Sequence, residues 1–246
     1  MRPLVVIPTY DEVGSLPATH RRLRAAGVDA DVLVVDDNSP DGTGELANRL
    51  AENDERLFVL HRQGRGGLGG AYRAGFAWGL ERDYDAFVEM DADGSHDPAD
   101  LPRLVQTLGG ADLVIGSRYV PGGGVADWPR RRLWLSKGGN RYVRLATGLP
   151  VNDATAGFRA YRRTLLEALD LTTIQSEGYS FQIEMALRTW QAGFTILEVP
   201  ILFTERQVGA SKMNRAIVAE ALRRITEWGW EGPRHPDPPH PASVRS

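Results

Sequence analysis

The sequence predicts an α/β fold built on a mainly parallel sheet with helices on both faces. Short apolar runs alternate with helical patterns along the first half of the chain, an order typical of parallel strands joined by crossover helices. The runs contain few polar residues, as strands buried on both faces do. With 246 residues, 42% of them hydrophobic and 25% charged, the chain is long enough for one large domain with a full core.

Five strands of this sheet are predicted from continuous apolar runs. In chain order they are LVVIP at residues 4–8, VLVVDD at 32–37, LFVL at 57–60, AFVEM at 86–90 and LVIG at 113–116. Helical patterns separate them, at residues 15–26, 42–52, 69–82 and 98–106. Ligands bind such sheets outside the carboxyl ends of the strands. We therefore expect a site where the polar segments 8–12, 36–37 and 91–93 meet.

The second half of the chain is less regular. A polar loop is expected at residues 152–159, a helix at 183–190, a strand at 195–203 and a final amphipathic helix at 215–228. The segment 232–246 is rich in Pro and His and is expected to be disordered. Residues 1–231 then form one folded domain.

The composition excludes several functions. A net charge of −3 gives no bulk attraction to nucleic acid. The absence of cysteine excludes disulfides and thiolate chemistry and fits a reducing compartment. No secretory signal is visible, and no apolar run approaches the roughly 18 to 20 residues that cross a bilayer. We expect a protein that is soluble or peripheral, on the side of the membrane where it is made.

The most informative segment is the end of the fourth strand, where Asp91 and Asp93 are one residue apart. Their side chains lie on the same side if the strand geometry persists. Two carboxylates this close suit Mg²⁺ or Mn²⁺, which keep several waters and also bind substrate phosphates. A solvated turn is the alternative for an isolated pair. Three polar clusters at one sheet edge favour a metal–diphosphate site.

Two further clusters lie at the same edge. Asp37 ends the second strand and is interpreted as a contact to a nucleobase or ribose, whereas Asp36 is expected to support the turn over residues 38–43. The glycine-rich segment 64–70 precedes a helix, so its backbone could approach a phosphate. A flexible loop over the site is the equal alternative, because the segment matches neither a P-loop nor a dinucleotide fingerprint.

A basic region follows the fifth strand. Segment 118–144 carries seven basic residues, with Trp128, Trp134 and Tyr142 interleaved among them, and Arg132 and Ser136 lie one helical turn apart. Two guanidinium groups, from Arg118 and Arg132, with this hydroxyl could hold a phosphate monoester. Basic residues mixed with Trp also fit an anionic membrane surface. One alternative is a solvated basic helix. Another is a nucleic-acid contact, although the segment shows no known nucleic-acid-binding motif.

Two loops complete the candidate site. Asp153 serves either in an acceptor site or in ordering its own loop, and the sequence leaves both open. Arg206 and Lys212 could neutralise a diphosphate leaving group from a loop that closes over the substrate.

Together these segments resemble the polyprenol (dolichol) monophosphate mannose synthases, inverting glycosyltransferases of the GT-A fold. The resemblance extends to about residue 232 and is closest to the actinobacterial form. The matching segments, in order, are IPTYDE (7–12), VVDDNSPDGT (34–43), MDADGSH (90–96), GSRYVPGG (116–123), RRLWLSK (131–137), DATAGFRAY (153–161), GYSFQIE (178–184) and FTERQVGASKM (203–213).

The resemblance implies a GDP-mannose donor, a polyprenyl phosphate acceptor and a divalent metal, Mg²⁺ or Mn²⁺. It makes residues 1–231 a GT-A catalytic domain. The positions that match family residues contacting the nucleotide sugar are Pro8, Tyr10, Glu12, Val35, Asp37, Ala92, Arg118, Arg206 and Lys212, together with the metal-binding Asp91 and Asp93. The positions that match family residues holding the acceptor phosphate are Arg118, Arg132 and Ser136. Ser95 stands where the family often has Gln, so the resemblance leaves open whether a side chain ligates the metal there.

The implied reaction needs no general base, because the acceptor phosphate is already an anion at pH 7. Attack by the acceptor phosphate on the anomeric carbon of the donor inverts the configuration of that carbon and gives a β-mannosyl phosphate and GDP. Many relatives carry transmembrane helices after the catalytic domain, and none is expected here. Retention at the cytoplasmic face of the membrane would then depend on the basic amphipathic region or on a separate integral-membrane partner.

Three other functions remain as alternatives. A related enzyme could use UDP-glucose or another sugar nucleotide on the same lipid phosphate. A catalytically silent GT-A domain could bind a membrane partner, although the intact Asp91, Asp93 and Arg118 argue against this. A nucleotidyltransferase would require an N-terminal glycine-rich loop and a lysine that the sequence lacks. The roles of Asp153 and Glu184 stay open.

Overall fold

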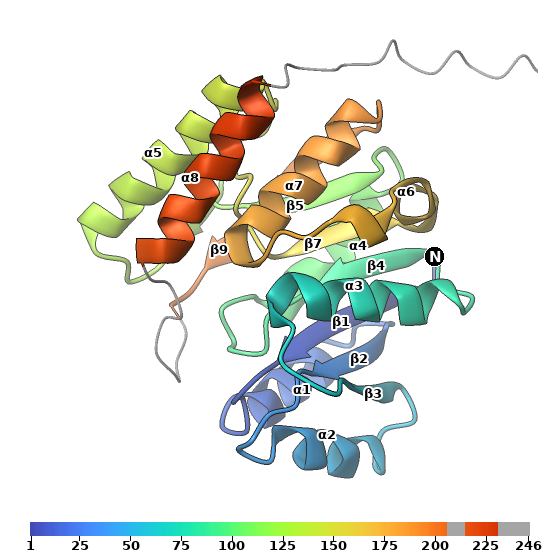
Figure 1. Cartoon of the computed structure of the whole chain (residues 1–246). Helices are drawn as coiled ribbons and strands as arrows, with labels where there is room; N and C mark the ends of the chain where they lie inside the picture. The colour runs from blue at the N-terminus through green and yellow to red at the C-terminus, as the bar shows by residue number, and fades with distance from the viewer. Residues whose placement is uncertain (206–214, 231–246) are drawn as a thin grey trace, which may run out of the picture.

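The computed structural model describes residues 1–205 and 215–230. Its centre is a seven-stranded sheet with the strand order β3-β2-β1-β4-β7-β5-β8 (Figure 1). The strands are β1 (Pro3–Thr9), β2 (Asp31–Asp36), β3 (Leu57–His61), β4 (Ala86–Glu89), β5 (Leu113–Ser117), β7 (Arg159–Arg162) and β8 (Ile196–Pro200). The five predicted strands are all present within a residue or two of their expected bounds. The predicted mainly parallel α/β sheet is therefore confirmed.

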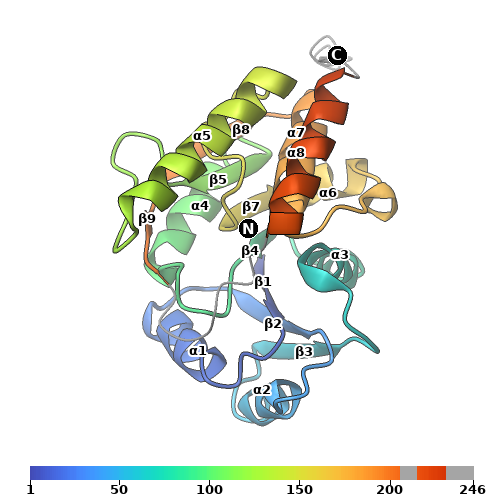
Figure 2. The same cartoon turned by 60° about the vertical axis from the view of Figure 1, so that its left-hand side comes forward.

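Helices cover both faces of the sheet (Figures 1 and 2). Alternate side chains of each strand enter different cores, so that Leu4 and Val6 pack on one face while Val5 and Ile7 pack on the other. On the first face lie α3 (Gly67–Leu80), α6 (Arg163–Ala168) and α7 (Gly178–Gln191). On the second lie α1 (Leu16–Ala25), α2 (Thr43–Ala51) and α4 (Leu101–Thr107), which follows a short 3₁₀ turn at Pro98–Asp100.

Strand β7 was not predicted from the sequence. It lies between β4 and β5 and runs antiparallel to both, with Arg159 opposite Glu89 on one side and Ile115 on the other. The expected polar loop over residues 152–159 therefore ends one residue early, at the start of this strand. The sequence RAYR is short and has two arginines, so it lacks the apolar run that marked the other strands.

The predicted late strand is two strands in different sheets. Residues 196–200 form the edge strand β8, and β9 (Leu202–Phe203) pairs with β6 (Gly124–Val125) in a separate two-stranded sheet. The predicted helix at 183–190 also begins earlier, since α7 starts at Gly178. This earlier start brings the first turn of α7 to the carboxyl edge of the sheet.

Two long helices pack against each other beside the sheet (Figures 1 and 2). They are α5 (Arg130–Thr147) and α8 (Arg215–Trp230). The hydroxyl groups of Tyr142 and Thr226 lie 2.8 Å apart across this pair. Over the described part of the chain, no helix combines the length and apolar character needed to cross a bilayer.

An ionic cluster lies at the edge of the sheet opposite the carboxyl ends of the parallel strands, at the start of β2. Asp31 accepts hydrogen bonds from Arg2 (3.0 Å), Arg56 (2.9 Å) and the Tyr84 hydroxyl (3.0 Å). Burial alone would raise the pKa of Asp31, but these hydrogen bonds outweigh it and lower the pKa. The ionised carboxylate therefore ties the N-terminus, β2 and β4 together far from the carboxyl edge.

Candidate active site

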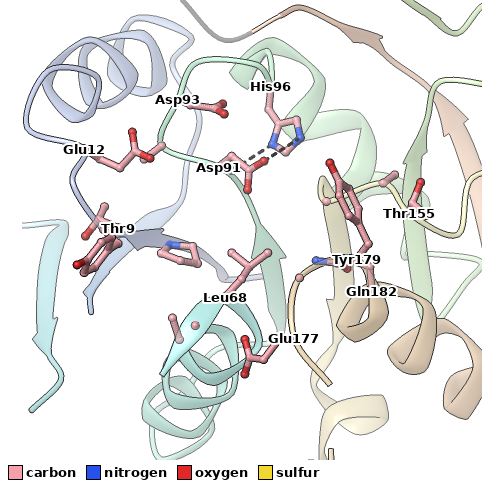
Figure 3. Close-up of a pocket in the computed structure, with 18 of the residues that line it drawn as sticks. Thr9, Glu12, Leu68, Asp91, Asp93, His96, Thr155, Glu177, Tyr179 and Gln182 are labelled. Carbon is pink, nitrogen blue, oxygen red and sulfur yellow. Dashed lines mark hydrogen bonds and ion pairs between the residues drawn. The ribbon is translucent and has the colours of Figure 1, made fainter. Parts of the chain in front are cut away.

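A cavity of about 470 Å³ opens at the carboxyl edge of the sheet, where the sequence predicted a site (Figure 3). Most of the predicted residues line it, namely Pro8, Tyr10, Glu12, Asp37, Asp91, Ala92, Asp93, Arg118 and Arg132. They come from the end of β1, from the loops after β1, β2, β4 and β5, and from α5. The parallel strands bring these loops together because their carboxyl ends share one edge.

The acidic wall of the cavity follows β4. The backbone N–H of Asp91 donates to Nδ1 of His96 over 3.1 Å, and Nε2 of the same ring lies 3.9 Å from the Asp91 carboxylate. Burial lowers the pKa of His96 to about 4, so the ring is neutral at pH 7. Asp93 accepts hydrogen bonds from the backbone and the hydroxyl of Ser95. Ser95 is fully buried, and its hydroxyl is engaged with Asp93.

These two carboxylates fit a divalent cation that is shared with a substrate. Within residues 1–205 and 215–230, no group of three or more His, Cys, Asp or Glu side chains is placed to hold a metal. Mg²⁺ and Mn²⁺ sites that use one or two carboxylates complete their shell with substrate phosphates and water. The donor set of Asp91 and Asp93 therefore suits a metal–diphosphate rather than a metal held by protein alone.

Asp37 holds the glycine-rich loop instead of presenting a bare carboxylate. It forms an ion pair with Arg62 and accepts hydrogen bonds from the backbone of Gly66 (2.8 Å) and Gly67 (2.9 Å). Gly67 has a φ of +74°, a conformation that residues with a Cβ rarely adopt. Asp36 supports the turn after β2, as expected, because it accepts from the backbone and hydroxyl of Ser39.

The N-terminus of α3 is occupied by a protein carboxylate. Glu177 accepts a hydrogen bond from the Gly69 backbone over 3.0 Å, and it lines the cavity. Burial raises the pKa of Glu177, although hydrogen bonds from the Gly69 and Gly70 backbones oppose the shift. The backbone N–H groups of Gly66, Gly67 and Gly69 therefore bind Asp37 and Glu177, not an incoming phosphate, in this conformation.

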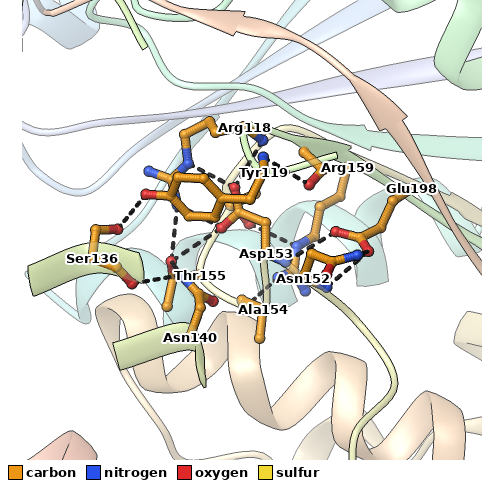
Figure 4. Close-up of polar contacts among 12 residues, drawn as sticks. Arg118, Tyr119, Ser136, Asn140, Asn152, Asp153, Ala154, Thr155, Arg159 and Glu198 are labelled. Atoms are coloured by element: carbon orange, nitrogen blue, oxygen red, sulfur yellow. Dashed lines mark hydrogen bonds and ion pairs between the residues drawn. The ribbon is translucent and has the colours of Figure 1, made fainter. Parts of the chain in front are cut away.

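The basic wall is built around a buried ion pair (Figure 4). Arg118 donates from Nε (2.7 Å) and Nη2 (2.6 Å) to the two carboxylate oxygens of Asp153, and its backbone N–H donates to the same group over 3.0 Å. Nη2 also reaches Thr155 over 2.9 Å. Desolvation would lower the pKa of Arg118, but the charge of Asp153 outweighs it and raises the pKa. Asp153 thus orders both its own loop and Arg118.

A second arginine approaches the first across an indole ring. The guanidinium carbon of Arg132 lies 4.0 Å from the ring centroid of Trp128, and that of Arg118 lies 5.5 Å from the same centroid. Arg132 also forms an ion pair with Glu205. Both arginines line the cavity. The arrangement brings two cations to one indole ring in the same cavity as Asp91 and Asp93.

Two predicted site residues of the described part of the chain do not line the cavity. Val35 is fully buried in the core, so its side chain does not reach the cavity. Ser136 does not line the cavity either, and its hydroxyl accepts a hydrogen bond from Tyr119 over 2.7 Å. Glu184 is buried against Ser176 and Arg188. Arg206, Lys212 and the expected tail at 232–246 lie outside the described residues.

Several cavity residues were missed by the sequence analysis, above all Glu177, Tyr179 and Gln182 at the start of α7. The sequence held one signal that these residues belong to the site. Gln182 and Glu184 interrupt an otherwise apolar run in FQIEM, and a polar residue on the buried face of a helix requires a partner or a function.

The chain matches known proteins over most of its length. The model of glycosyl transferase family 2 matches residues 4–170. An undecaprenyl-phosphate mannosyltransferase of Micrococcus luteus is 56% identical over 95% of this chain and 98% of its own. A polyprenol monophosphomannose synthase of Mycolicibacterium smegmatis is 53% identical over 94% of this chain and 88% of its own.

The fold also matches solved structures. A mannosyltransferase from Pyrobaculum calidifontis, solved with GDP-Man and Mn²⁺, superposes with a TM-score of 0.64 at 21% identity, over 96% of this chain and 66% of that one. The expected GT-A fold, with a mostly parallel central sheet, is confirmed.

Proposed function

Since the chain belongs to glycosyl transferase family 2, among the polyprenol monophosphomannose synthases, we propose that this glycosyltransferase moves mannose from GDP-mannose to a polyprenyl phosphate with inversion. The products are polyprenyl β-mannosyl phosphate and GDP. The names of the two relatives support the sugar and the acceptor class. The donor nucleotide is supported by the GDP-Man in the superposed mannosyltransferase.

One observation carries the proposal: a single cavity has a pair of carboxylates on one wall and a pair of arginines on another. Asp91 and Asp93 would hold a metal–diphosphate, and Arg118 and Arg132 would hold a phosphate monoester. A reaction between a sugar diphosphate and a lipid phosphate requires both kinds of site within one cavity. A metal of the Mg²⁺ or Mn²⁺ type would stabilise charge on the leaving diphosphate.

The donor nucleotide would lie between the loop after β1 and the start of α3. Tyr10 and Glu12 line the cavity there, and the guanidinium carbon of Arg65 lies 4.2 Å from the Tyr10 ring centroid. We propose that Pro8, Tyr10 and Glu12 contact the nucleotide directly. Asp37 would contribute by fixing the glycine-rich loop, and Arg206 and Lys212 stay proposed contacts of the diphosphate.

Arg118 and Arg132 would reduce the electrostatic repulsion between the acceptor phosphate and the donor diphosphate, because the reaction brings these two anions together. The buried Asp153 fixes the Arg118 guanidinium, while Arg132 is less buried and more adjustable. Charge neutralisation by both would let the acceptor oxygen approach the anomeric carbon from the side opposite the diphosphate. The phosphate is a competent nucleophile as an anion, so the chain needs no base at this position and forms no covalent glycosyl-enzyme.

The acceptor's lipid chain requires an apolar surface near the basic wall. On α5, large apolar side chains are exposed, with 73% of Trp134, 67% of Leu135 and 73% of Leu145 accessible. Basic residues of the same helix surround them. We propose that this face rests on the anionic cytoplasmic face of the membrane, with or without an integral-membrane partner.

Transfer of radiolabelled sugar to a polyprenyl phosphate in detergent tests the proposal. GDP-mannose and UDP-glucose are compared, each with Mn²⁺, with Mg²⁺ and with EDTA. We expect a mannolipid only from GDP-mannose and only with metal. Transfer from UDP-glucose alone would replace the donor, and equal transfer in EDTA would remove the metal from the reaction.

A further inference from the structure

A cluster of buried polar atoms lies beneath the floor of the cavity. Both carboxylate oxygens of Glu89, the hydroxyls of Tyr72 and Tyr161, and both amide atoms of Gln182 have no hydrogen-bond partner of standard geometry among the described residues. Buried polar groups almost always have such a partner, in the protein, in water or in a ligand. Glu89 lies near both Gln182 and Tyr161, so these groups form one polar cluster whose hydrogen bonds are incomplete.

Gln182 connects this cluster to the cavity. It lies on the cavity side of α7 next to Tyr179 (Figure 3), and only 2% of it is accessible. A second neighbour is Glu89 on β4, whose carboxylate interacts with the Gln182 amide. Both amide atoms are therefore enclosed by protein, at the boundary between this cluster and the cavity.

The backbone at Gln182 is rigidly held. Arg159, fully buried on β7, donates to the carbonyl of Gln182 over 2.6 Å. The same guanidinium donates to the carbonyls of Ala154 and Ala156, each over 2.7 Å. One side chain thus locks the first turns of α7 to the loop that carries Asp153. A rigid support of this kind is what a recognition group requires.

The position of Gln182 relative to the two anion sites suggests its ligand. The acidic wall with Asp91 would hold the diphosphate, and the loop with Thr155 adjoins Arg118 at the acceptor site. In an in-line transfer, the hexose lies between the leaving diphosphate and the incoming phosphate. Gln182 lines the same cavity. Its amide has both a donor and an acceptor, as sugar hydroxyls do.

We propose that the side-chain amide of Gln182 binds hydroxyl groups of the donor hexose and so helps to select the sugar. The inference rests on the proposed transfer from a GDP-sugar and adds a residue that recognises its hexose. A hydrogen-bonding site of this type rejects substrates that leave its buried polar atoms unpaired. The alternative occupant of the cluster is a structural water, which would give Gln182 no influence on the donor.

The test compares Gln182→Leu with the wild-type enzyme. Leu keeps the approximate volume and removes both polar atoms. We expect kcat/KM for GDP-mannose to fall roughly 10- to 100-fold, in line with the loss of one or two hydrogen bonds to substrate. The inhibition constant of GDP, which has no hexose, should change less than about 2-fold, and circular dichroism should show an intact fold.

Thr189→Val is the matched control. Thr189 lies on the same helix, is fully buried and donates to the carbonyl of Met185 over 2.7 Å, but it does not line the cavity. Its kcat/KM should stay near the wild-type value. A Gln182→Leu variant with unchanged kcat/KM, or with GDP inhibition weakened as much as turnover, would overturn the inference. Wild-type enzyme that cannot use GDP-mannose would instead refute the proposed function, and the inference with it.

Discussion

Replacing Asp153 with Asn should destabilise the protein and damage the acceptor site together. Asp153 is fully buried and accepts two side-chain hydrogen bonds and one backbone hydrogen bond from Arg118, of which only 5% of the side chain is accessible. In the variant, the guanidinium stays buried without its counter-charge. Removing one partner of a buried ion pair costs about 3 to 5 kcal/mol.

The lower end of this range applies here, because an Asn oxygen at the Oδ2 position can still accept two of the three hydrogen bonds. A loss of about 3 kcal/mol corresponds to a fall in Tm of roughly 6 to 12 °C for a chain of this size. Denaturant unfolding followed by circular dichroism measures the change. Glu227→Gln is the control, because it breaks an exposed ion pair with Arg223 on α8 and should cost less than about 0.5 kcal/mol.

A double variant separates lost charge pairing from lost packing. If an unpaired guanidinium is what destabilises Asp153→Asn, then adding Arg118→Met should restore part of the lost stability, since both charges are then gone. The reasoning is refuted if Asp153→Asn unfolds within about 0.5 kcal/mol of wild type, or if the second substitution only adds to the loss.

Three other changes test other parts of the molecule. Asp91→Asn should reduce metal-dependent mannosyl transfer by more than about 100-fold with an unchanged circular dichroism spectrum, and near-wild-type turnover would remove Asp91 from the metal site. Asp31 has a lowered pKa in the folded state, so its carboxylate stabilises the fold above its unfolded pKa of about 3.9 and loses this effect as pH falls. Asp31→Asn should therefore be less stable than wild type at pH 7, and the difference in stability should shrink below about pH 4. A difference in denaturation midpoints that does not change with pH would contradict this. Trp134→Ser should weaken sedimentation with anionic lipid vesicles, whereas Val13→Ser, an exposed apolar residue between β1 and α1, should not; equal binding by wild type and Trp134→Ser would exclude α5 as the membrane contact.

The sequence predicted the sheet well because local patterns decide buried parallel strands. Each of the five predicted strands is a continuous apolar run, and a run such as Leu4–Ile7 has no other stable place than a core. Strand β7 was not predicted, because its stability depends on contacts with neighbouring segments. Arg159 is fully buried there only because carbonyls of a loop and of α7 accept its hydrogen bonds, and no local pattern announces those partners.

The same limit applies to the site. Asp91 and Asp93 could be recognised because their spacing alone suggests a metal. Asp37 could be placed at the cavity, but its hydrogen-bond partners could not be predicted. They are backbone groups of a loop about thirty residues further along the chain, and no local sequence pattern links the two segments. Arg118 was predicted as a cation for phosphate without its buried counter-ion, since the pairing with Asp153 depends on how β5 and β7 are arranged.

The antiparallel direction of β7 explains how the two walls of the cavity come to face each other. Arg159, the first residue of β7, is opposite Glu89 near the end of β4 and Ile115 near the end of β5. The loop that leads into β7 therefore starts at the carboxyl edge, with Asp153 beside Arg118. A parallel strand at this place would bring the same loop to the other edge, far from Asp91. The reversed strand thus allows one edge of the sheet to carry both the carboxylates proposed to hold a diphosphate and the arginines proposed to hold a phosphate.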